Sequence, residues 1–374
     1  MDYEYIDRPE RLAELVERIS GELVLGVDTE AAGYHRYLDR LSLVQISTRD
    51  EHFLIDPLAI PDLSALAPVM ANPDVEKIFH DADFDLRIMD RDAEMRVRGL
   101  FDTQIAAAFL GERQLGLGAI VERFLGIKLP KAYQRADWAE RPLTEGMKEY
   151  AATDTAYLPQ LRDALRAQLE ELGRMEWARE EFERREETRY VESNEADAFL
   201  RVKGARDLPP RGLAVLRELH AWREAVAKER DQATFRVLGN QSLIAMSLNP
   251  PANAGQLPQV DGLSQGLADR RGRDIFAAIQ RGLAVPDDEL PRFPPSRRWD
   301  RDPEAEARGE RLREARGRVA EDLGLDPGFL ISRAVLDEIA RRNPRSTEAL
   351  REIPDVRGWQ VEAMGDSLLG VLRT

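Results

Sequence analysis

Apolar and polar positions follow the period of strands in the first third of the chain. An unbroken apolar run at residues 23–27 and a period-two alternation at 41–47 are both typical of strands, and a third run follows at 52–57. Three such strands in succession predict an antiparallel meander. Further strands are expected at 77–79 and 100–101, each followed by a helical pattern. Because this alternation favours a sheet covered by helices, the pattern predicts an α/β domain with a mixed sheet.

The pattern is helical from about residue 147 onward. Residues 160–195 are dense in Glu and Arg and carry leucines at helical spacing, which predicts a solvent-exposed connecting helix. The leucines that form this face are Leu161, Leu165, Leu169 and Leu172.

Prolines divide the remainder of the helical part. The pair Pro209-Pro210 predicts a boundary, and the prolines between residues 286 and 303 predict a linker. Two later segments, 243–250 and 336–344, each contain a short amphipathic helix that ends in Asn-Pro, which predicts a diverged repeat. We therefore expect three domains, at residues 1–195, 205–285 and 305–374.

Composition narrows the class of protein. The 374 residues include no cysteine, which excludes disulfides, cysteine-ligated zinc and thiol nucleophiles and fits a reducing compartment. No uncharged apolar run approaches the roughly 18–20 residues of a membrane span, and the acidic N-terminus lacks the basic start of a signal peptide. We therefore expect a cytoplasmic protein without a membrane partner.

The net charge of −15 is unevenly distributed. Residues 1–200 hold 25 basic and 42 acidic side chains, whereas residues 201–281 hold 13 basic and 8 acidic ones. The middle segment is therefore the expected surface for phosphate groups, with arginines clustered at 201–211 and 270–273. The alternative is that these arginines form an ordinary solvated surface.

Candidate metal ligands follow two of the expected strands. Asp28 and Glu30 are two residues apart, so on a strand both side chains face the same side. Burying both is costly unless cations or hydrogen bonds compensate them. Asp81, Asp83 and Asp85 follow a second strand, where Asp85 would lie in the first turns of a helix and Asp81 or Asp83 could cap it. The residues alone do not choose among these three acids.

A phenol and a carboxylate complete the candidate site. Tyr150 and Asp154 share one helix face because four residues separate them. Hydrolysis of a phosphodiester is commonly assisted by two Mg²⁺ or Mn²⁺ ions about 3.5–4 Å apart, and these hard ions prefer oxygen ligands. Asp154 could complete such a metal site, and Tyr150 could orient the attacking water. Together the three acidic elements predict a nuclease.

Other chemically interesting residues have a simpler interpretation. Asp102 is expected to cap the helix that follows it, and His80 to lie in the core or behind the metal ligands. Trp138 and Trp222 could stack on bases, but packing is the favoured role for both. None of the six lysines is followed by Ser or Thr, so the chain lacks a P-loop and no nucleotide cofactor is expected.

The order of the acidic elements resembles the ribonuclease D family, within the tyrosine-bearing (DEDDy) subclass of the DEDD exonucleases. The matching segments are 27–30, 43–46, 77–85, 138–143 and 150–158. The family's H-x4-D spacing, counted from His80, selects the third acid. The resemblance implies that the metal ligands are Asp28, Glu30, Asp85 and Asp154, that they bind two divalent ions, and that Tyr150 positions the water.

The two C-terminal segments resemble the helical HRDC domain. The pattern at 216–224 and the helix ending at Asn249-Pro250 carry this resemblance. The fold that it implies is an RNase H-like mixed-sheet exonuclease domain followed by two all-α HRDC-like domains. Three positions depart from the pattern: Ala31, where an aromatic is frequent, Ala233, where proline is usual, and Asn240, where Asp is usual.

The resemblance implies a 3′–5′ exoribonuclease that releases nucleoside 5′-monophosphates from RNA with a 3′ extension, notably from tRNA precursors. Three alternatives remain open. The same chemistry could act on DNA, the fold could serve as a catalytically silent RNA-binding adaptor, or the helical repeats could form a pure interaction scaffold.

Overall fold

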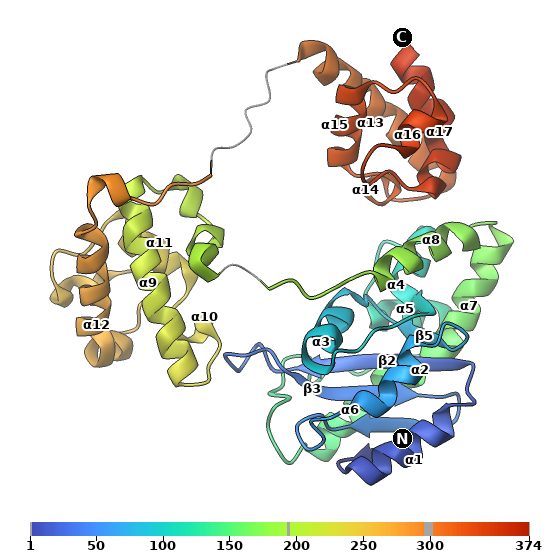
Figure 1. Cartoon of the computed structure of the whole chain (residues 1–374), viewed down its shortest axis with the longest axis horizontal. Helices are drawn as coiled ribbons and strands as arrows, with labels where there is room; N and C mark the ends of the chain where they lie inside the picture. The colour runs from blue at the N-terminus through green and yellow to red at the C-terminus, as the bar shows by residue number, and fades with distance from the viewer. Residues whose placement is uncertain (1, 193–194, 295–301, 374) are drawn as a thin grey trace.

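Six strands form one mixed sheet in the N-terminal part of a computed structural model that describes residues 2–192, 195–294 and 302–373 (Figure 1). The strand order is β1-β4-β3-β2-β5-β6. The strands are β1 (Glu4–Ile6), β2 (Val24–Ala31), β3 (Leu41–Ser47), β4 (His52–Ile55), β5 (Glu76–Phe79) and β6 (Leu100–Asp102). The predicted meander is confirmed, because β2, β3 and β4 pair antiparallel, and the other pairings are parallel.

Helices cover the sheet in chain order. Helix α6 (Glu145–Ala156) packs on β2, β3 and β4, α7 (Leu158–Glu171) on β2 and β5, and α8 (Met175–Glu186) on β6. The remaining helices of this domain are α1 (Pro9–Ile19), α2 (Ala67–Ala71), α3 (Asp83–Ala93), α4 (Thr103–Phe109) and α5 (Leu117–Leu125). The α/β domain with a mixed sheet is therefore as expected.

The prediction of a solvent-exposed connecting helix at 160–195 is wrong. Two helices, α7 and α8, occupy this region, and the stripe of leucines on α7 is fully buried against the sheet through Leu161, Leu165 and Leu169. The fourth leucine, Leu172, lies beyond the end of α7 and is 52% exposed. Gly173 has φ +66°, a left-handed conformation that ends the helix at low cost for glycine.

Two all-helical modules follow. The first contains α9 (Pro210–Glu229), α10 (Thr234–Val237), α11 (Asn240–Leu248) and α12 (Gln265–Leu283), packed around a core of its own. The second contains α13 (Pro303–Leu323), α14 (Pro327–Leu330), α15 (Arg333–Arg342), α16 (Thr347–Arg351) and α17 (Gly358–Arg373). Among the described residues, no helix is both long and apolar enough to span a lipid bilayer.

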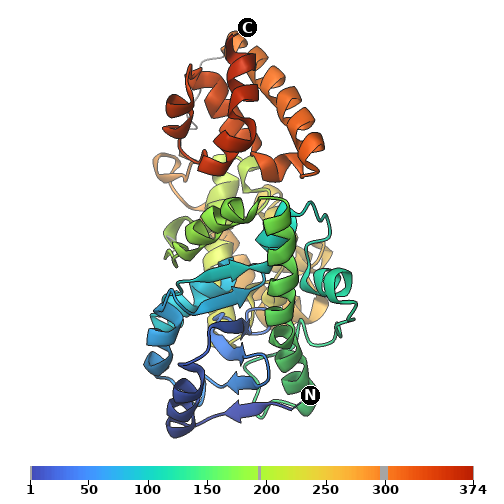
Figure 2. The same cartoon turned by 90° about the vertical axis from the view of Figure 1, so that its right-hand side faces the viewer.

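The second module and the α/β domain share one hydrophobic core. Figure 2 shows this module, in red, above the α/β domain. The Phe109 ring meets Phe329 and Trp359 edge-on, with centroids 4.8 and 4.9 Å apart. Glu180 accepts hydrogen bonds from the backbone N–H groups of Gly358 and Trp359 at 2.7 and 2.8 Å. Aromatic packing and hydrogen bonds therefore fix this module against the end of the sheet domain that carries α4 and α8.

The first module contacts a different part of the α/β domain, the loop between β2 and β3 (residues 32–40, called the β2–β3 loop). The Ala233 N–H donates to the His35 carbonyl at 3.1 Å. Asp231 accepts from Arg36 at 3.4 Å and from the Tyr37 N–H at 3.3 Å. Proline has no N–H to donate, so the alanine that replaces the usual proline at position 233 permits one of these contacts.

Candidate metal centre

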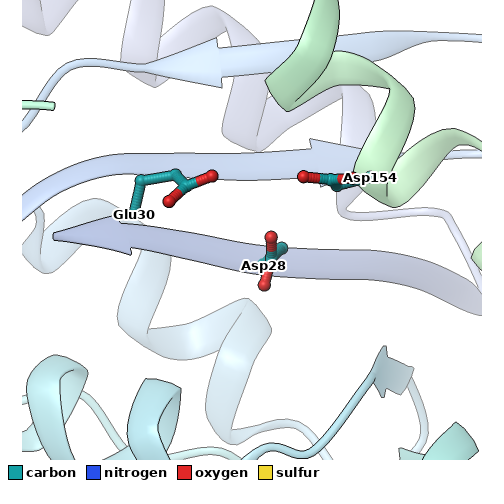
Figure 3. Close-up of side chains that lie close together, drawn as sticks. All are labelled: Asp28, Glu30 and Asp154. Carbon is teal, nitrogen blue, oxygen red and sulfur yellow. The ribbon is translucent and has the colours of Figure 1, made fainter. Parts of the chain in front are cut away.

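Three of the predicted acids converge at one point of the sheet (Figure 3). Asp28 and Glu30 extend from β2, and Asp154 extends from the last turns of α6. Each residue offers one carboxylate oxygen, and these oxygens lie within 4.8 Å of one another. The spacing explains the arrangement, because residues two apart on a strand share a face and α6 packs on that strand.

A glycine on β2 permits the close approach of α6. A Cβ atom at Gly26 would lie 2.8 Å from the Thr155 carbonyl oxygen, closer than van der Waals contact allows. Thr155 directly follows Asp154, so the missing side chain lets the carboxylate of the helix reach the acids of the strand.

Asp85 lies beside this cluster rather than inside it. It belongs to the first turn of α3, it is buried, and its Oδ1 accepts a hydrogen bond from Thr29 Oγ1 at 2.5 Å. Thr29 stands between the two strand acids in the sequence. Sequence reasoning missed the role of Thr29, although a hydroxyl between two acids was a visible signal.

The structure gives Asp81 and Asp83 surroundings different from those of Asp85. The prediction that Asp81 or Asp83 caps α3 is wrong, because Ala82 occupies the cap position and makes no side-chain bond. The carboxylate of Asp102 instead accepts from the N–H groups of Asp81 and Ala82, at 3.1 and 2.9 Å. Asp83 forms ion pairs with two arginines on its exposed side, Arg87 and Arg185.

The four acids have strongly raised pKa values. Burial raises the pKa of Asp28 well above its usual range, and the charges of Asp85, Glu30 and Asp154 raise it further. Burial and the charges of Asp154 and Asp85 do the same to the pKa of Glu30. Burial raises the pKa of Asp85 to about 7 against the opposing hydrogen bond from Thr29. Burial likewise raises the pKa of Asp154 to about 7.

A divalent cation fits this set of donors. Within the described part of the chain, none of the four acids forms an ion pair with Lys, Arg or His, so the protein itself leaves their charges uncompensated. The three clustered acids are only partly buried and therefore remain reachable from solvent. Converging carboxylate oxygens are the ligands that hard divalent ions prefer, and a bound ion would favour their ionised forms.

Tyr150 lies one helical turn before Asp154, and its hydroxyl interacts with that carboxylate. Burial and the charges of Asp154 and Glu30 raise the pKa of Tyr150 well above its ordinary value, so the hydroxyl keeps its proton. The ring contacts those of Trp138 and Tyr133, with centroids 6.2 and 6.1 Å away. Sequence reasoning missed Tyr133, for which an aromatic residue just before the 138–143 motif was the available signal.

The remaining candidates have structural roles. Asp102 caps α4 as expected, accepting from the N–H groups of Gln104 and Ile105. His80 Nδ1 lies 2.9 Å from Thr103 Oγ1. This contact accounts for the orientation of the imidazole without a bond to a metal or to a metal ligand. Trp138 and Trp222 are 1% and 9% exposed, so both pack rather than present a face for stacking.

A buried arginine is the partner of Asn240, which stands where the family pattern usually has Asp. Asn240 Oδ1 accepts a hydrogen bond of 2.7 Å from the guanidinium of Arg223, which is buried in the first helical module. The amide thus occupies the place where an aspartate would form an ion pair.

Comparison with known proteins agrees with this arrangement. A family model described as a 3′-5′ exonuclease matches residues 3–170, and the HRDC domain model matches residues 212–279 and 305–372. The two HRDC matches confirm the predicted repeat.

The chain is similar over nearly its full length to proteins called ribonuclease D. It is 33% identical to Ribonuclease D of Pseudomonas paraeruginosa, in an alignment that covers 94% of this chain and 92% of the relative. It is 32% identical to Ribonuclease D of Escherichia coli, in an alignment that covers 78% of each chain.

Solved structures give the same result. The crystal structure of Escherichia coli RNase D superposes with a TM-score of 0.74 at 29% identity, covering 100% of this chain and 99% of the other. A protein from Bifidobacterium adolescentis superposes with a TM-score of 0.84 at 29% identity over 99% and 97%. The expected fold, an RNase H-like exonuclease domain followed by two HRDC-like helical domains, is therefore confirmed. The chain belongs to the ribonuclease D family of metal-dependent 3′–5′ exoribonucleases.

Proposed function

We propose that Asp28, Glu30, Asp85 and Asp154 bind two divalent ions, Mg²⁺ or Mn²⁺, and that with them the chain shortens RNA from its 3′ end. The observation that carries the proposal is the set of three carboxylate oxygens within 4.8 Å of one another, with Asp85 close enough for its charge to raise the pKa of two of them. Such a concentration of partly buried negative charge is costly in a folded protein unless a cation binds it.

The metal ions would activate the attacking water and stabilise the departing 3′-oxygen. The chain's own residues align the reactants. Tyr150 keeps its proton beside Asp154 and can orient the water through its hydroxyl, and Thr29 holds Asp85 in place. Attack by water on the terminal phosphodiester with loss of the 3′-oxygen releases a nucleoside 5′-monophosphate.

The substrate that we propose is RNA with a 3′ extension, in particular a tRNA precursor. The Escherichia coli structure is described as that of an exoribonuclease involved in structured RNA processing, which supports this choice. The relatives are bacterial proteins named for action on RNA, so the compartment that we propose is the cytoplasm. The catalytic domain would span residues 1–195 and the two helical domains residues 205–285 and 305–374.

Digestion of a 3′-extended tRNA tests the proposal. The chain is incubated with the RNA and Mg²⁺, Mn²⁺ or EDTA, and the products are sized and identified. We expect stepwise shortening with release of nucleoside 5′-monophosphates, abolished by EDTA and by Asp28→Asn. Internal cuts, or shortening that persists in EDTA, would contradict it. A recessed DNA 3′ end in the same assay tests the alternative that DNA is the substrate.

A further inference from the structure

Two aromatic rings and two guanidinium groups gather where the β2–β3 loop meets the first helical module. The rings of Tyr34 and Phe235 have centroids 5.2 Å apart and are tilted by 51°. The guanidinium carbons of Arg236 and Arg135 lie 4.9 and 5.6 Å from the Tyr34 centroid. We call these four residues the seam cluster, because Tyr34 and Arg135 come from the exonuclease domain and Phe235 and Arg236 come from α10.

The seam cluster is open to solvent. Tyr34 is 43% exposed and Phe235 is 49% exposed, although large apolar rings are usually buried when their only role is packing. Both arginines are exposed as well. Within the described ranges, neither guanidinium has a carboxylate within ion-pair distance, so both positive charges remain available to a ligand.

Hydrogen bonds as well as ring contacts hold the two domains together at this place. The docking bonds are the hydrogen bond from Ala233 to His35, the bonds from Arg36 and Tyr37 to Asp231, and the bond of 2.9 Å from Arg236 Nε to the Tyr34 carbonyl oxygen. In addition Arg36 pairs with Asp137 at 2.8 Å within the exonuclease domain. The exposed rings of the seam cluster can therefore be changed while these docking bonds remain.

Short segments join the seam cluster to the metal centre. Tyr34 is four residues beyond Glu30, so the chain between them spans at most about 14 Å. On the other side, Arg135 is three residues before Trp138, whose ring packs on Tyr150. In Figure 1, α10 lies beside the end of the β2–β3 hairpin, in agreement with these contacts.

We propose that the seam cluster binds single-stranded RNA on the 5′ side of its terminal dinucleotide, with bases stacked on Tyr34 and Phe235 and phosphates contacted by Arg135 and Arg236. The proposal rests on the function proposed above. Exposed rings stack on the faces of unpaired bases, and arginines beside them contact the backbone. The ligand lies on the 5′ side because a 3′-terminal phosphodiester in the metal centre leaves RNA in only that direction.

Kinetics on substrates of different length test the proposal in the full-length chain. The substrates are a dinucleotide, too short to reach the seam cluster, and an RNA with a ten-nucleotide single-stranded 3′ tail. For Tyr34→Ala combined with Phe235→Ala, we expect KM on the tailed RNA to rise about tenfold or more, with kcat little changed. Hydrolysis of the dinucleotide should not change.

Salt dependence tests the contribution of charge separately. Arg135→Ala removes one side chain that would neutralise a phosphate, and it leaves the docking bond from Arg236 to Tyr34 in place. The slope of log affinity against log salt concentration should therefore fall by about 0.7 for a single strand. Binding of the tailed RNA is measured by fluorescence anisotropy in EDTA, which prevents cleavage. The matched controls are Leu172→Ala, an exposed apolar side chain beyond α7, and Arg351→Ala, an exposed arginine of α16 in the other module.

The outcomes separate the two proposals. If the wild-type chain shortens RNA but the ring variant leaves KM on the tailed RNA unchanged, or slows the dinucleotide equally, the seam cluster does not bind RNA. If the wild-type chain shortens no RNA with either metal, the proposed function itself fails. Should the alanine variant not fold, Tyr34→Leu with Phe235→Leu keeps apolar bulk without an aromatic face. The same rise in KM is then expected.

Discussion

Replacing Asp154 by asparagine should stabilise the metal-free protein and inactivate it. Burial raises the pKa of this carboxyl from an ordinary 3.8 to about 7. The folded chain therefore binds the proton more tightly than the unfolded chain, and its stability falls as pH rises from about 4 to about 7. Asparagine carries no charge at any pH, so it avoids this loss.

The magnitude follows from the pKa difference. A pKa raised by that amount corresponds to roughly 2–4 kcal/mol of destabilisation at pH 8, allowing for the partial exposure of the carboxyl. For a domain of this size the melting temperature should then rise by about 5–10 °C on Asp154→Asn. At pH 4 the gain should largely disappear, because the wild-type carboxyl is then protonated in the folded state.

Thermal unfolding of the full-length chain in EDTA at pH 4 and pH 8 measures the effect. Saturating Mn²⁺ should cancel most of this difference, since a ligand at 100 times its Kd stabilises the wild type by about 2.7 kcal/mol and the variant has lost one donor. RNA hydrolysis should fall by at least about 100-fold. Asp83→Asn is the matched control, because Arg87 and Arg185 lower the pKa of Asp83 and its loss should destabilise at pH 8. A lower melting temperature for Asp154→Asn in EDTA at pH 8 would refute the reasoning.

Three further substitutions give sharp outcomes. Tyr150→Phe should lower kcat about 10- to 100-fold, because one hydrogen bond to the attacking water is lost. The metal affinity, measured by calorimetry, should not change. A weaker metal affinity would instead show that Tyr150 positions the metal ligands. Gly26→Ala should push α6 away from β2, because its Cβ would meet the Thr155 carbonyl oxygen at 2.8 Å. We expect the free energy of unfolding, measured in urea, to fall by about 1–3 kcal/mol and kcat to fall as well. An unchanged kcat would argue against that close approach. Asn240→Asp should raise the stability of the first helical module by about 1 kcal/mol by pairing with buried Arg223, and a drop in the urea midpoint would contradict this.

The sequence predicted those parts of the fold and site that depend on local spacing. The acids at positions 28 and 30 share a face because strand geometry has a period of two, and the four-residue step from Tyr150 to Asp154 matches a helical turn. Strand β1 was not predicted, because three residues are too few to show a period. The residues alone did not choose Asp85 over Asp81 and Asp83, and only the family resemblance selected it. Its bond to Thr29 joins residues far apart in the chain and was not predicted.

What the sequence did not reveal depends on partners that are distant along the chain. The leucine stripe of α7 fits an exposed helix and a helix packed on a sheet equally well, and only the sheet beneath it decides. The docking of Ala233 on His35 joins two domains through backbone atoms, which leave no trace in side-chain patterns. The exposed pair of Tyr34 and Phe235 likewise becomes visible only when the domains are assembled.

The core that the last module shares with the catalytic domain has a consequence for biosynthesis. Phe109 leaves the ribosome long before Trp359, its partner from α17. At roughly 5–20 residues per second, the intervening stretch takes about 10–50 seconds to translate. During that interval the nascent nuclease carries an uncovered aromatic surface, which is the kind of surface that chaperones bind. Premature termination before α14 would make this exposure permanent and leave a truncated product prone to aggregation.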